Sequence, residues 1–212
     1  CAARAGMLCE ACARDLSRKS AACPHCALSL HAAQGACAAC RRQRFAFDRA
    51  IACFDYRFPL DRLVQRFKYA GDLALGRRLA RSLAEIAAGE PRPDALVVPP
   101  LSPARLRARG FNQALEIARE VGRRLRVRVA PGLLVRLRET PAQAGLGRRA
   151  RRDNLRGAFA CTQSLAGARV AIVDDVLTTG ATADTIARVL KSAGAESVAV
   201  WALARAPDPS QP

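Results

Sequence analysis

The chain has 212 residues, and its 35 Lys and Arg against 18 Asp and Glu give a formal net charge of +17. Half of the residues are hydrophobic, which excludes a disordered polycation, and no run approaches the roughly 18 apolar residues of a membrane span. We therefore expect a cytoplasmic globular protein of one to two domains that binds phosphate groups, because an Arg-rich surface attracts them.

Seven of the nine cysteines lie within the first 40 residues and indicate a small N-terminal module. They include three C-x-x-C pairs, a spacing at which two thiolates of one turn bind a tetrahedral metal. The ligands expected for one structural zinc ion are Cys23, Cys26, Cys37 and Cys40. The ligands expected for a first zinc ion are Cys1, Cys9 and Cys12, with the fourth ligand falling before the first residue. A disulfide framework is the alternative for the same cysteines.

Strands and helices alternate after a basic linker at 41–48. Apolar runs predict strands at 50–56, 95–98, 133–137, 170–173 and 198–203. A period of 3.6 residues predicts helices at 60–67, 75–86, 111–125 and 183–193. The segment 138–157 interrupts this pattern with six Arg and is expected to be a long basic loop.

This alternation predicts an α/β fold with a mainly parallel sheet flanked by helices, whose ligands bind at the carboxyl ends of the strands. We expect three parts along the chain. They are a double zinc ribbon at 1–44 with its first site truncated, an α/β domain at 45–205 and a flexible tail at 206–212.

The segment 171–182 carries the clearest chemistry. Asp174 and Asp175 follow an apolar strand, and a Thr/Gly loop at 178–182 opens the next helix. Helix N-terminal amides, a glycine and hydroxyls suit a monophosphate, whereas paired carboxylates suit sugar hydroxyls or a hydrated Mg²⁺. A ribose 5-phosphate is therefore the expected ligand. A receiver domain needs more chain than the 37 residues after Asp175, and no Gly-x-x-x-x-Gly-Lys-Ser/Thr motif is present. A purely structural strand-turn-helix is the remaining alternative.

The same segment resembles the phosphoribosyl pyrophosphate (PRPP) signature of type I phosphoribosyltransferases, and nearly the whole chain resembles the ComF family, the relatives of competence protein F. Besides the signature, the motifs that carry this resemblance are the leading zinc ribbon, Arg66-Phe67-Lys68-Tyr69, Arg109-Gly110-Phe111-Asn112-Gln113, and Arg152-Asp153-Asn154-Leu155 before Ala158-Phe159. The resemblance implies a type I phosphoribosyltransferase-like fold that binds PRPP together with Mg²⁺.

The resemblance also implies roles for individual residues. The implied PRPP-binding residues are Asp174, Asp175, Val176, Thr178, Thr179, Gly180, Ala181 and Thr182. Of these, Asp174 and Asp175 would be catalytic and hold the ribose hydroxyls. The implied pyrophosphate and hood residues are Pro99, Pro100, Arg105, Arg109, Arg148 and Arg152. The Pro99-Pro100 pair is unusual for a pyrophosphate loop, and no residue is assigned to the acceptor base.

Nucleic acid is a second expected partner. Seven of the ten aromatic residues lie between Phe45 and Tyr69 among basic residues, where they would either stack on single strands or pack the core. The ComF resemblance implies uptake or processing of single-stranded DNA, with DNA-uptake and helicase machinery as partners. We therefore predict a PRPP-binding, phosphoribosyltransferase-like protein of natural transformation. The alternative is a phosphoribosyltransferase of nucleobase salvage.

Overall fold

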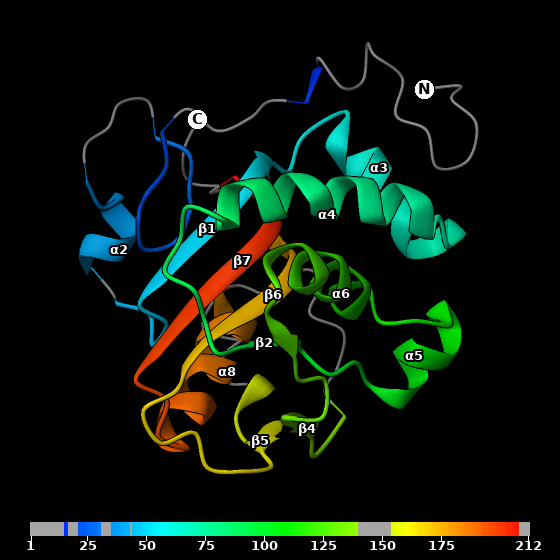
Figure 1. Cartoon of the computed structure of the whole chain (residues 1–212). Helices are drawn as coiled ribbons and strands as arrows, with labels where there is room; N and C mark the ends of the chain where they lie inside the picture. Colours follow the sequence, from blue (N-terminus) through cyan, green and yellow to red (C-terminus); the bar gives the residue numbers. More distant parts are fainter. Residues whose placement is uncertain (1–14, 17–20, 31–34, 43, 140–153, 208–212) are drawn as a thin grey trace.

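A computed structural model describes residues 15–16, 21–30, 35–42, 44–139 and 154–207 of the chain (Figure 1). Its helices are α2 (Ala38–Arg42), α3 (Leu60–Ala70), α4 (Leu73–Ala87), α5 (Pro103–Arg109), α6 (Gln113–Leu125) and α8 (Ala181–Ser192). Its strands are β1 (Arg49–Asp55), β2 (Ala95–Val97), β3 (Arg128–Val129), β4 (Leu134–Arg136), β5 (Phe159–Cys161), β6 (Arg169–Leu177) and β7 (Ser197–Arg205). Among the described helices, none combines the length and hydrophobicity that crossing a bilayer requires.

Five parallel strands form the central sheet in the order β1-β7-β6-β2-β3. The long pairing of β6 with β7 runs from Arg169 opposite Ser197 to Leu177 opposite Arg205. A parallel sheet is what strands joined by helices produce, and the predicted fold class is confirmed. Because the strands run the same way, their carboxyl ends lie along one edge. β4 and β5 form a separate antiparallel pair.

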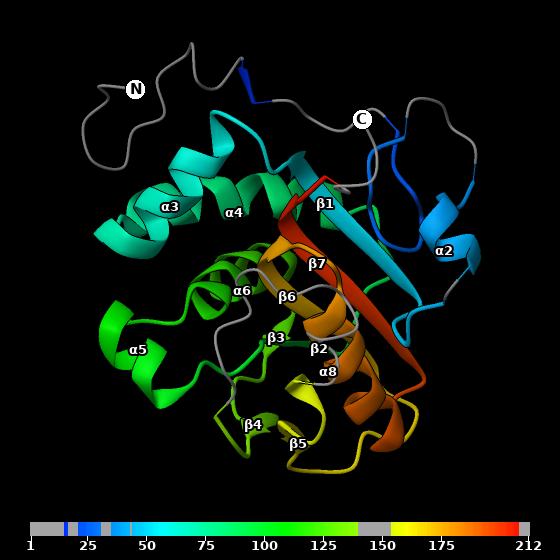
Figure 2. The same cartoon turned by 180° about the vertical axis from the view of Figure 1, so that it is seen from behind.

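Helices cover both faces of the sheet, with α4 and α6 on one face and α8 on the other (Figures 1 and 2). Successive residues of β6 therefore enter different cores. Ala171 and Val173 pack in the cluster that contains α3, α4 and α6, whereas Val170 and Ile172 pack with α8. A central strand buried on both faces reads as a continuous apolar run, which is why the sequence indicated it.

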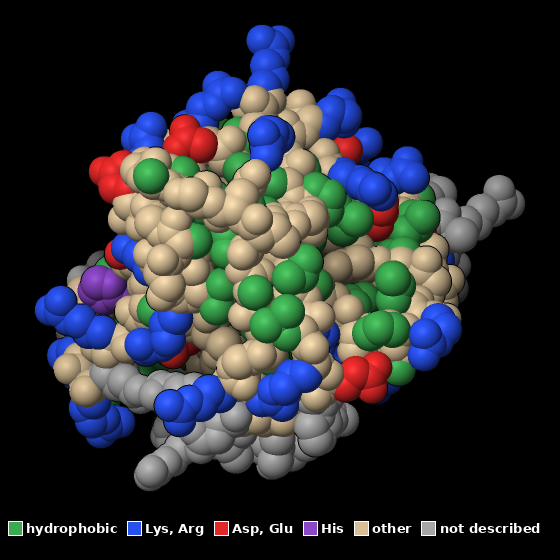
Figure 3. Space-filling view, turned by 90° about the horizontal axis from the view of Figure 1, so that it is seen from below, with side chains coloured by type: hydrophobic (Ala, Val, Ile, Leu, Met, Phe, Trp, Pro, Cys, Tyr) green, Lys and Arg blue, Asp and Glu red, His purple; other side chains and the backbone are tan. Residues whose placement is uncertain are grey.

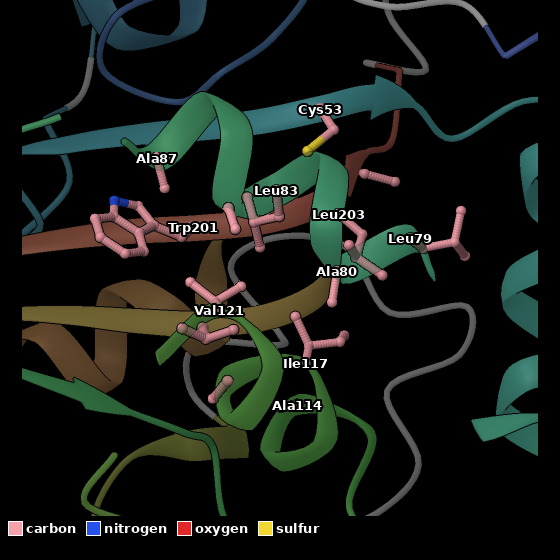
Figure 4. Packing of buried hydrophobic residues seen from close by; sticks show 14 of the residues in the cluster. Cys53, Leu79, Ala80, Leu83, Ala87, Ala114, Ile117, Val121, Trp201 and Leu203 are labelled. Carbon is pink, nitrogen blue, oxygen red and sulfur yellow. The ribbon is translucent and has the colours of Figure 1, made fainter. Parts of the chain in front are cut away.

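The larger core lies between the sheet and the pair α4 and α6 (Figure 4). Leu83 of α4 and Ile117 and Val121 of α6 are fully buried, and they face Trp201 of β7, which is 1% exposed. Each large apolar side chain buried in this way contributes about 2 kcal/mol to folding. This core fixes α6 against the sheet and so places the N-terminus of that helix at the edge formed by the strand ends.

The predicted elements differ from the observed ones in places that have local causes. The helix predicted at 111–125 begins at Gln113, because the Asn112 side chain accepts hydrogen bonds from the N–H groups of Ala114 and Leu115. The strand predicted at 170–173 continues to Leu177, because its pairing with β7 continues. The prediction missed β3 and β5, and it missed α5, which has no buried residue and hence no apolar period.

The cysteine module, defined here as residues 21–30 and 35–42, forms its own small apolar cluster. It docks on β1, where Ser29 Oγ donates to Asp55 Oδ1 at 2.6 Å and Ala50 N donates to Pro24 O at 3.4 Å. The predicted basic linker at 41–48 is partly helical, since α2 extends to Arg42. The domain boundary at residue 44 stays a prediction.

The charge of the chain is visible on its surface. On the face in Figure 3, Lys and Arg side chains are spread around a central group of hydrophobic side chains, and Asp and Glu side chains are fewer. A surface of this composition attracts polyanions at long range.

Candidate functional site

A cleft of about 390 Å³ opens at the edge where β2 and β6 end. Its walls come from α3, the loop after β2, the junction of α5 with α6, the β4–β5 pair, and the end of β6 with the start of α8. Ligand sites of parallel α/β sheets lie at this edge, as the sequence predicted. The cleft therefore brings together segments that are far apart along the chain.

Two carboxylates from the end of β6 form one wall of the cleft. Asp175 is 8% exposed, and its Oδ2 lies 2.7 Å from Nζ of Lys68, which reaches in from α3. The Asp175 N–H donates to Asp174 Oδ1 at 2.8 Å, and the Val176 N–H donates to Asp175 Oδ1 at 2.7 Å. The strand backbone thus holds both carboxylates side by side.

The surroundings of the two carboxylates differ, and they shift the pKa of Asp174. Burial, together with the adjacent Asp175 carboxylate, raises the pKa of Asp174 to about 7. Burial opposes the charge of Lys68, but attraction to Asp175 outweighs it and raises the pKa of Lys68 above its usual value. Near neutral pH the site therefore holds the Lys68 ammonium group beside Asp175 and, at Asp174, a carboxyl group whose pKa is close to the pH of the medium.

The loop from β6 into α8, residues 178–182, forms the neighbouring wall. Gly180 is the N-cap of α8 with φ +78°, and it offers no side-chain cap, which leaves the helix N-terminus for an anion. Thr178 and Thr182 line the cleft. Thr179 instead accepts a hydrogen bond from the N–H of Ala181 at 3.3 Å and braces the turn.

Cationic side chains stand opposite the carboxylates. Arg105 and Arg109 line the cleft beside Pro99 and Pro100, and Arg107 does not. Arg109 Nη1 donates to Gln113 Oε1 at 2.9 Å, which fixes the direction of that guanidinium. Arg148 and Arg152, the other predicted hood residues, lie outside the described residues.

The structure adds residues that the sequence did not assign to the site. Among them are Lys68, Asn112, Gln113, Arg136 and Phe159. Arg136 enters from β4, and burial together with the nearby charge of Arg105 lowers its pKa. Gln113 is 2% exposed, and among the described residues no atom partners its Nε2. Four of these five, all except Arg136, belong to motifs that carried the family resemblance, which was the available signal.

The four cysteines predicted to share a metal are brought together. The Sγ atoms of Cys23, Cys26, Cys37 and Cys40 all lie within 4.8 Å of one another, and the four side chains are buried. Burial disfavours the Cys23 thiolate, yet backbone N–H groups, among them that of Cys37 at 3.3 Å, lower the pKa of Cys23 to about 7. Four sulfurs at this spacing fit a soft tetrahedral cation. Cys1, Cys9 and Cys12 lie outside the described residues.

Most of the aromatic residues considered for stacking on nucleic acid belong to the core. Phe54 and Phe67 are 2% and 0% exposed, and Tyr56 packs against the same cluster. Phe47 is also buried and Phe45 is half-buried, whereas Phe58 and Tyr69 are 76% and 72% exposed, so these two of the seven present a largely exposed ring to solvent.

Comparison with known proteins agrees with this geometry. The family model of the phosphoribosyl transferase domain matches residues 74–212. Competence protein F of Haemophilus influenzae is 35% identical over 176 residues, 79% of this chain and 77% of that protein. DNA utilization protein YhgH of Salmonella typhi is 33% identical over 204 residues, 93% of this chain and 90% of that protein.

Among solved structures, the purine phosphoribosyltransferase from Pyrococcus horikoshii superposes with a TM-score of 0.40 at 20% identity, covering 61% of this chain and 72% of that one. The family assignment rests on the domain match together with the two sequence relatives. The chain belongs to the phosphoribosyl transferase domain family and, within it, to the ComF family of competence protein F.

Proposed function

We propose that the cleft binds PRPP together with Mg²⁺. The observation that carries this proposal is the meeting, in one cleft, of a carboxylate pair, an uncapped helix N-terminus and a cationic wall. A sugar bearing phosphate groups at both ends matches this order of acidic and basic walls. The membership in the phosphoribosyl transferase domain family supports the same ligand.

In this proposal each wall contacts one part of the ligand. Asp174 and Asp175 accept hydrogen bonds from the ribose hydroxyls, and residues 178–182 hold the 5-phosphate. Arg105 and Arg109, with the Pro99-Pro100 turn, contact the diphosphate. Mg²⁺, for which the two carboxylates supply the hard oxygen ligands it prefers, adds charge neutralisation at the diphosphate.

The experiment is calorimetric titration of PRPP with Mg²⁺ into the wild type and into the Asp174→Asn, Asp175→Asn double variant. Saturable binding to the wild type that is lost in the double variant is the expected result. Asp61→Asn is the matched control, because Asp61 lies on α3 outside the cleft and accepts a local hydrogen bond from Arg62 N. Absence of binding to the folded wild type would overturn the proposal.

We propose further that this PRPP-binding protein acts in the uptake or processing of external single-stranded DNA, in contact with the uptake machinery. The names of its relatives, competence protein F and DNA utilization protein, support this role. The net charge of +17 supplies the sequence-independent attraction that binding of a DNA backbone needs.

A second candidate is transfer of the phosphoribosyl group to a nucleobase. Leu155 and Phe159 give the cleft an apolar side on which a base would stack. In that reaction the base displaces diphosphate from C1 of the ribose, and the Arg side chains stabilise the charge of the leaving group. Release of diphosphate from PRPP with any of a panel of nucleobases would support this candidate. Absence of diphosphate release with every base would exclude the candidate for those bases.

For the cysteine cluster we propose structural zinc. Four thiolates with no open position are typical of structural rather than catalytic sites. Protein purified under reducing conditions should contain zinc bound at the described cluster. Less than about half an equivalent would contradict this assignment.

A further inference from the structure

Arg205 connects the cysteine module to the loop at residues 178–182, here called the phosphate loop. It is the last residue of β7 and is 3% exposed. Its Nε donates to the carbonyl of Cys26, one of the clustered cysteines, at 2.9 Å. Its Nη1 donates to the carbonyls of Leu177, at 3.1 Å, and of Thr178. One buried guanidinium thus holds both segments through backbone atoms.

A second contact joins the same two regions. The ring of Phe45 packs against the cysteine cluster, and it also lies against Gly180. A Cβ atom at Gly180 would come within 2.9 Å of that ring. Phe45, in the linker that follows the module, therefore lies directly on the phosphate loop. Phe45 is itself stacked on Phe47, with ring centroids 4.6 Å apart.

A third contact reaches the first turn of α8. Asp184 is 1% exposed, and its Oδ1 accepts a hydrogen bond from the N–H of Ala46 at 2.6 Å. The linker that leaves the module is therefore bonded to the helix whose N-terminus forms the phosphate loop. Three contacts of different kinds, a guanidinium, a ring and a carboxylate, converge on one short segment.

We propose that the cysteine module positions the phosphate loop through Arg205, so that a metal held by the four cysteines strengthens binding of a phosphate group at the cleft. Metal ligation fixes the backbone at Cys26, and the Cys26 carbonyl fixes one end of the Arg205 guanidinium. The other end of the guanidinium then fixes the carbonyls of Leu177 and Thr178. Arg205 is a positioning residue in this arrangement, because it acts on the ligand through the loop and does not line the cleft.

The first test needs no ligand. Hydrogen exchange of the amides at residues 178–182 is measured in metal-loaded wild type, in Arg205→Gln and in wild type stripped of metal by a chelator. Exchange should be at least about tenfold faster in the variant and in the stripped protein, as expected for a segment that loses its local restraints. Exchange in α4, on the far side of the sheet, should stay unchanged and so exclude global unfolding.

The second test measures affinity. Ribose 5-phosphate titrated into the same three samples should bind about tenfold more weakly to Arg205→Gln and to the stripped protein, a typical size for coupling between two sites. Arg92→Gln is the matched control, because Arg92 Nη2 also donates to a carbonyl, that of Arg126 at 2.6 Å, but at the opposite edge of the sheet. It should leave exchange and affinity unchanged.

Arg205→Lys separates charge from geometry. A single ammonium cannot donate to Cys26 and Leu177 in the planar fork that Arg205 uses, so this variant should fold yet keep a loosened loop. Full recovery of slow exchange in Arg205→Lys would overturn the proposed role of the fork. If Arg205→Gln fails to fold, the metal-stripped wild type still decides the proposal.

The expected change in ligand affinity rests on the proposed PRPP site. The expected change in amide exchange at residues 178–182 does not. Unchanged exchange at residues 178–182 after metal removal, while residues 21–30 exchange freely, would overturn the coupling whatever the ligand is. Faster loop exchange without any binding of PRPP or ribose 5-phosphate would leave the coupling standing and refute the proposed function instead.

Discussion

Asp174 and Asp175 are neighbours in sequence and in space, yet their surroundings differ. Asp175 Oδ2 lies 2.7 Å from Lys68 Nζ, whereas Asp174 is half-buried beside another carboxylate, and its pKa is raised to about 7. The sequence placed both carboxylates at a ligand site, but it did not distinguish them. The distinction comes from α3, which brings Lys68 to one of the two.

The raised pKa of Asp174 predicts a pH-dependent gain in stability for Asp174→Asn. The unfolded carboxyl titrates near about pH 4 and the folded one near 7, so the folded state binds more protons between these values. The wild type therefore loses stability as pH rises through this window and stays at its lower level above it. At pH 8 we expect the free energy of unfolding of Asp174→Asn to be about 1 to 2 kcal/mol higher than that of the wild type.

Denaturant unfolding at pH 4, 6 and 8 measures this effect. The gain should shrink to a small remainder near pH 4, where the carboxyl is protonated in the folded state and about half protonated in the unfolded state. Asp61→Asn, which lies outside the cleft, should show no such trend. A gain that is the same at all three pH values would contradict the assignment.

We expect the Gln113 side chain to contribute to the affinity for PRPP but little to the free energy of unfolding. Its side-chain Nε2 is buried without a partner among the described residues and belongs to a side chain that lines the cleft. Gln113→Met should change the free energy of unfolding by less than about 1 kcal/mol, because the lost donor is unsatisfied in the free protein and the lost acceptor serves the half-exposed Arg109 guanidinium. PRPP should bind about tenfold more weakly, the effect of losing one hydrogen bond to a charged group.

Thermal unfolding and calorimetry of the Gln113→Met protein measure the two effects. Gln65→Met is the matched substitution on the exposed face of α3 and should alter neither. A large loss of stability with unchanged affinity would show that Gln113 serves the core and not the ligand.

At the scale of elements, the conformation of the loop between β6 and α8 depends on Phe45, a residue outside the sheet. Gly180 has φ +78° and lies under the ring of Phe45. The sequence indicated a glycine that lets backbone approach a phosphate, and it gave no sign that an aromatic ring occupies the other side. The loop is therefore shaped by the linker of the cysteine module as well as by its own residues.

Gly180→Ala should destabilise the protein by about 2 to 3 kcal/mol, because left-handed backbone strain adds to overpacking against Phe45. Gly167→Ala is the control for strain alone, since Gly167 has φ +71° with nothing within 4 Å of its added Cβ. It should cost about 1 kcal/mol. Denaturant unfolding measures both.

Adding Phe45→Leu to Gly180→Ala should recover part of the stability that Gly180→Ala loses beyond Gly167→Ala, because the smaller side chain leaves room for the added methyl group. Equal losses in the free energy of unfolding for Gly180→Ala and Gly167→Ala would show that the Phe45 ring moves aside without destabilising the protein.

At the scale of the whole molecule, the charge of +17 lies outside any single site. Figure 3 shows Lys and Arg side chains distributed over one face of the molecule. Such a distribution predicts binding of polyanions with little dependence on sequence. It is independent of the carboxylates that define the proposed PRPP site.

Affinity for single-stranded DNA should therefore fall at least about tenfold between about 50 and about 200 mM salt. Asp175→Asn should leave this affinity intact, because removing a negative charge does not weaken contacts to phosphates. Fluorescence anisotropy with a labelled oligonucleotide measures both effects. Binding that does not change with salt, or its absence at low salt, would reject a DNA-handling role carried by charge.

The sequence by itself determined the parallel α/β fold, the cysteine spacing and the Asp174–Asp175 pair with its Thr/Gly loop. These are local patterns, and periodicity or spacing within a short stretch specifies them. It did not determine α5, because a short helix that buries nothing leaves no apolar period.

The family resemblance implied Arg105 and Arg109, but only the tertiary structure decided that Lys68 and Arg136 also line the cleft. Lys68 reaches Asp175 across more than 100 residues of chain, and Arg205 reaches Cys26 across 179. Both contacts depend on how α3 and β7 pack on the sheet. Packing of elements distant in sequence is set by the whole core, and no local pattern of residues encodes it.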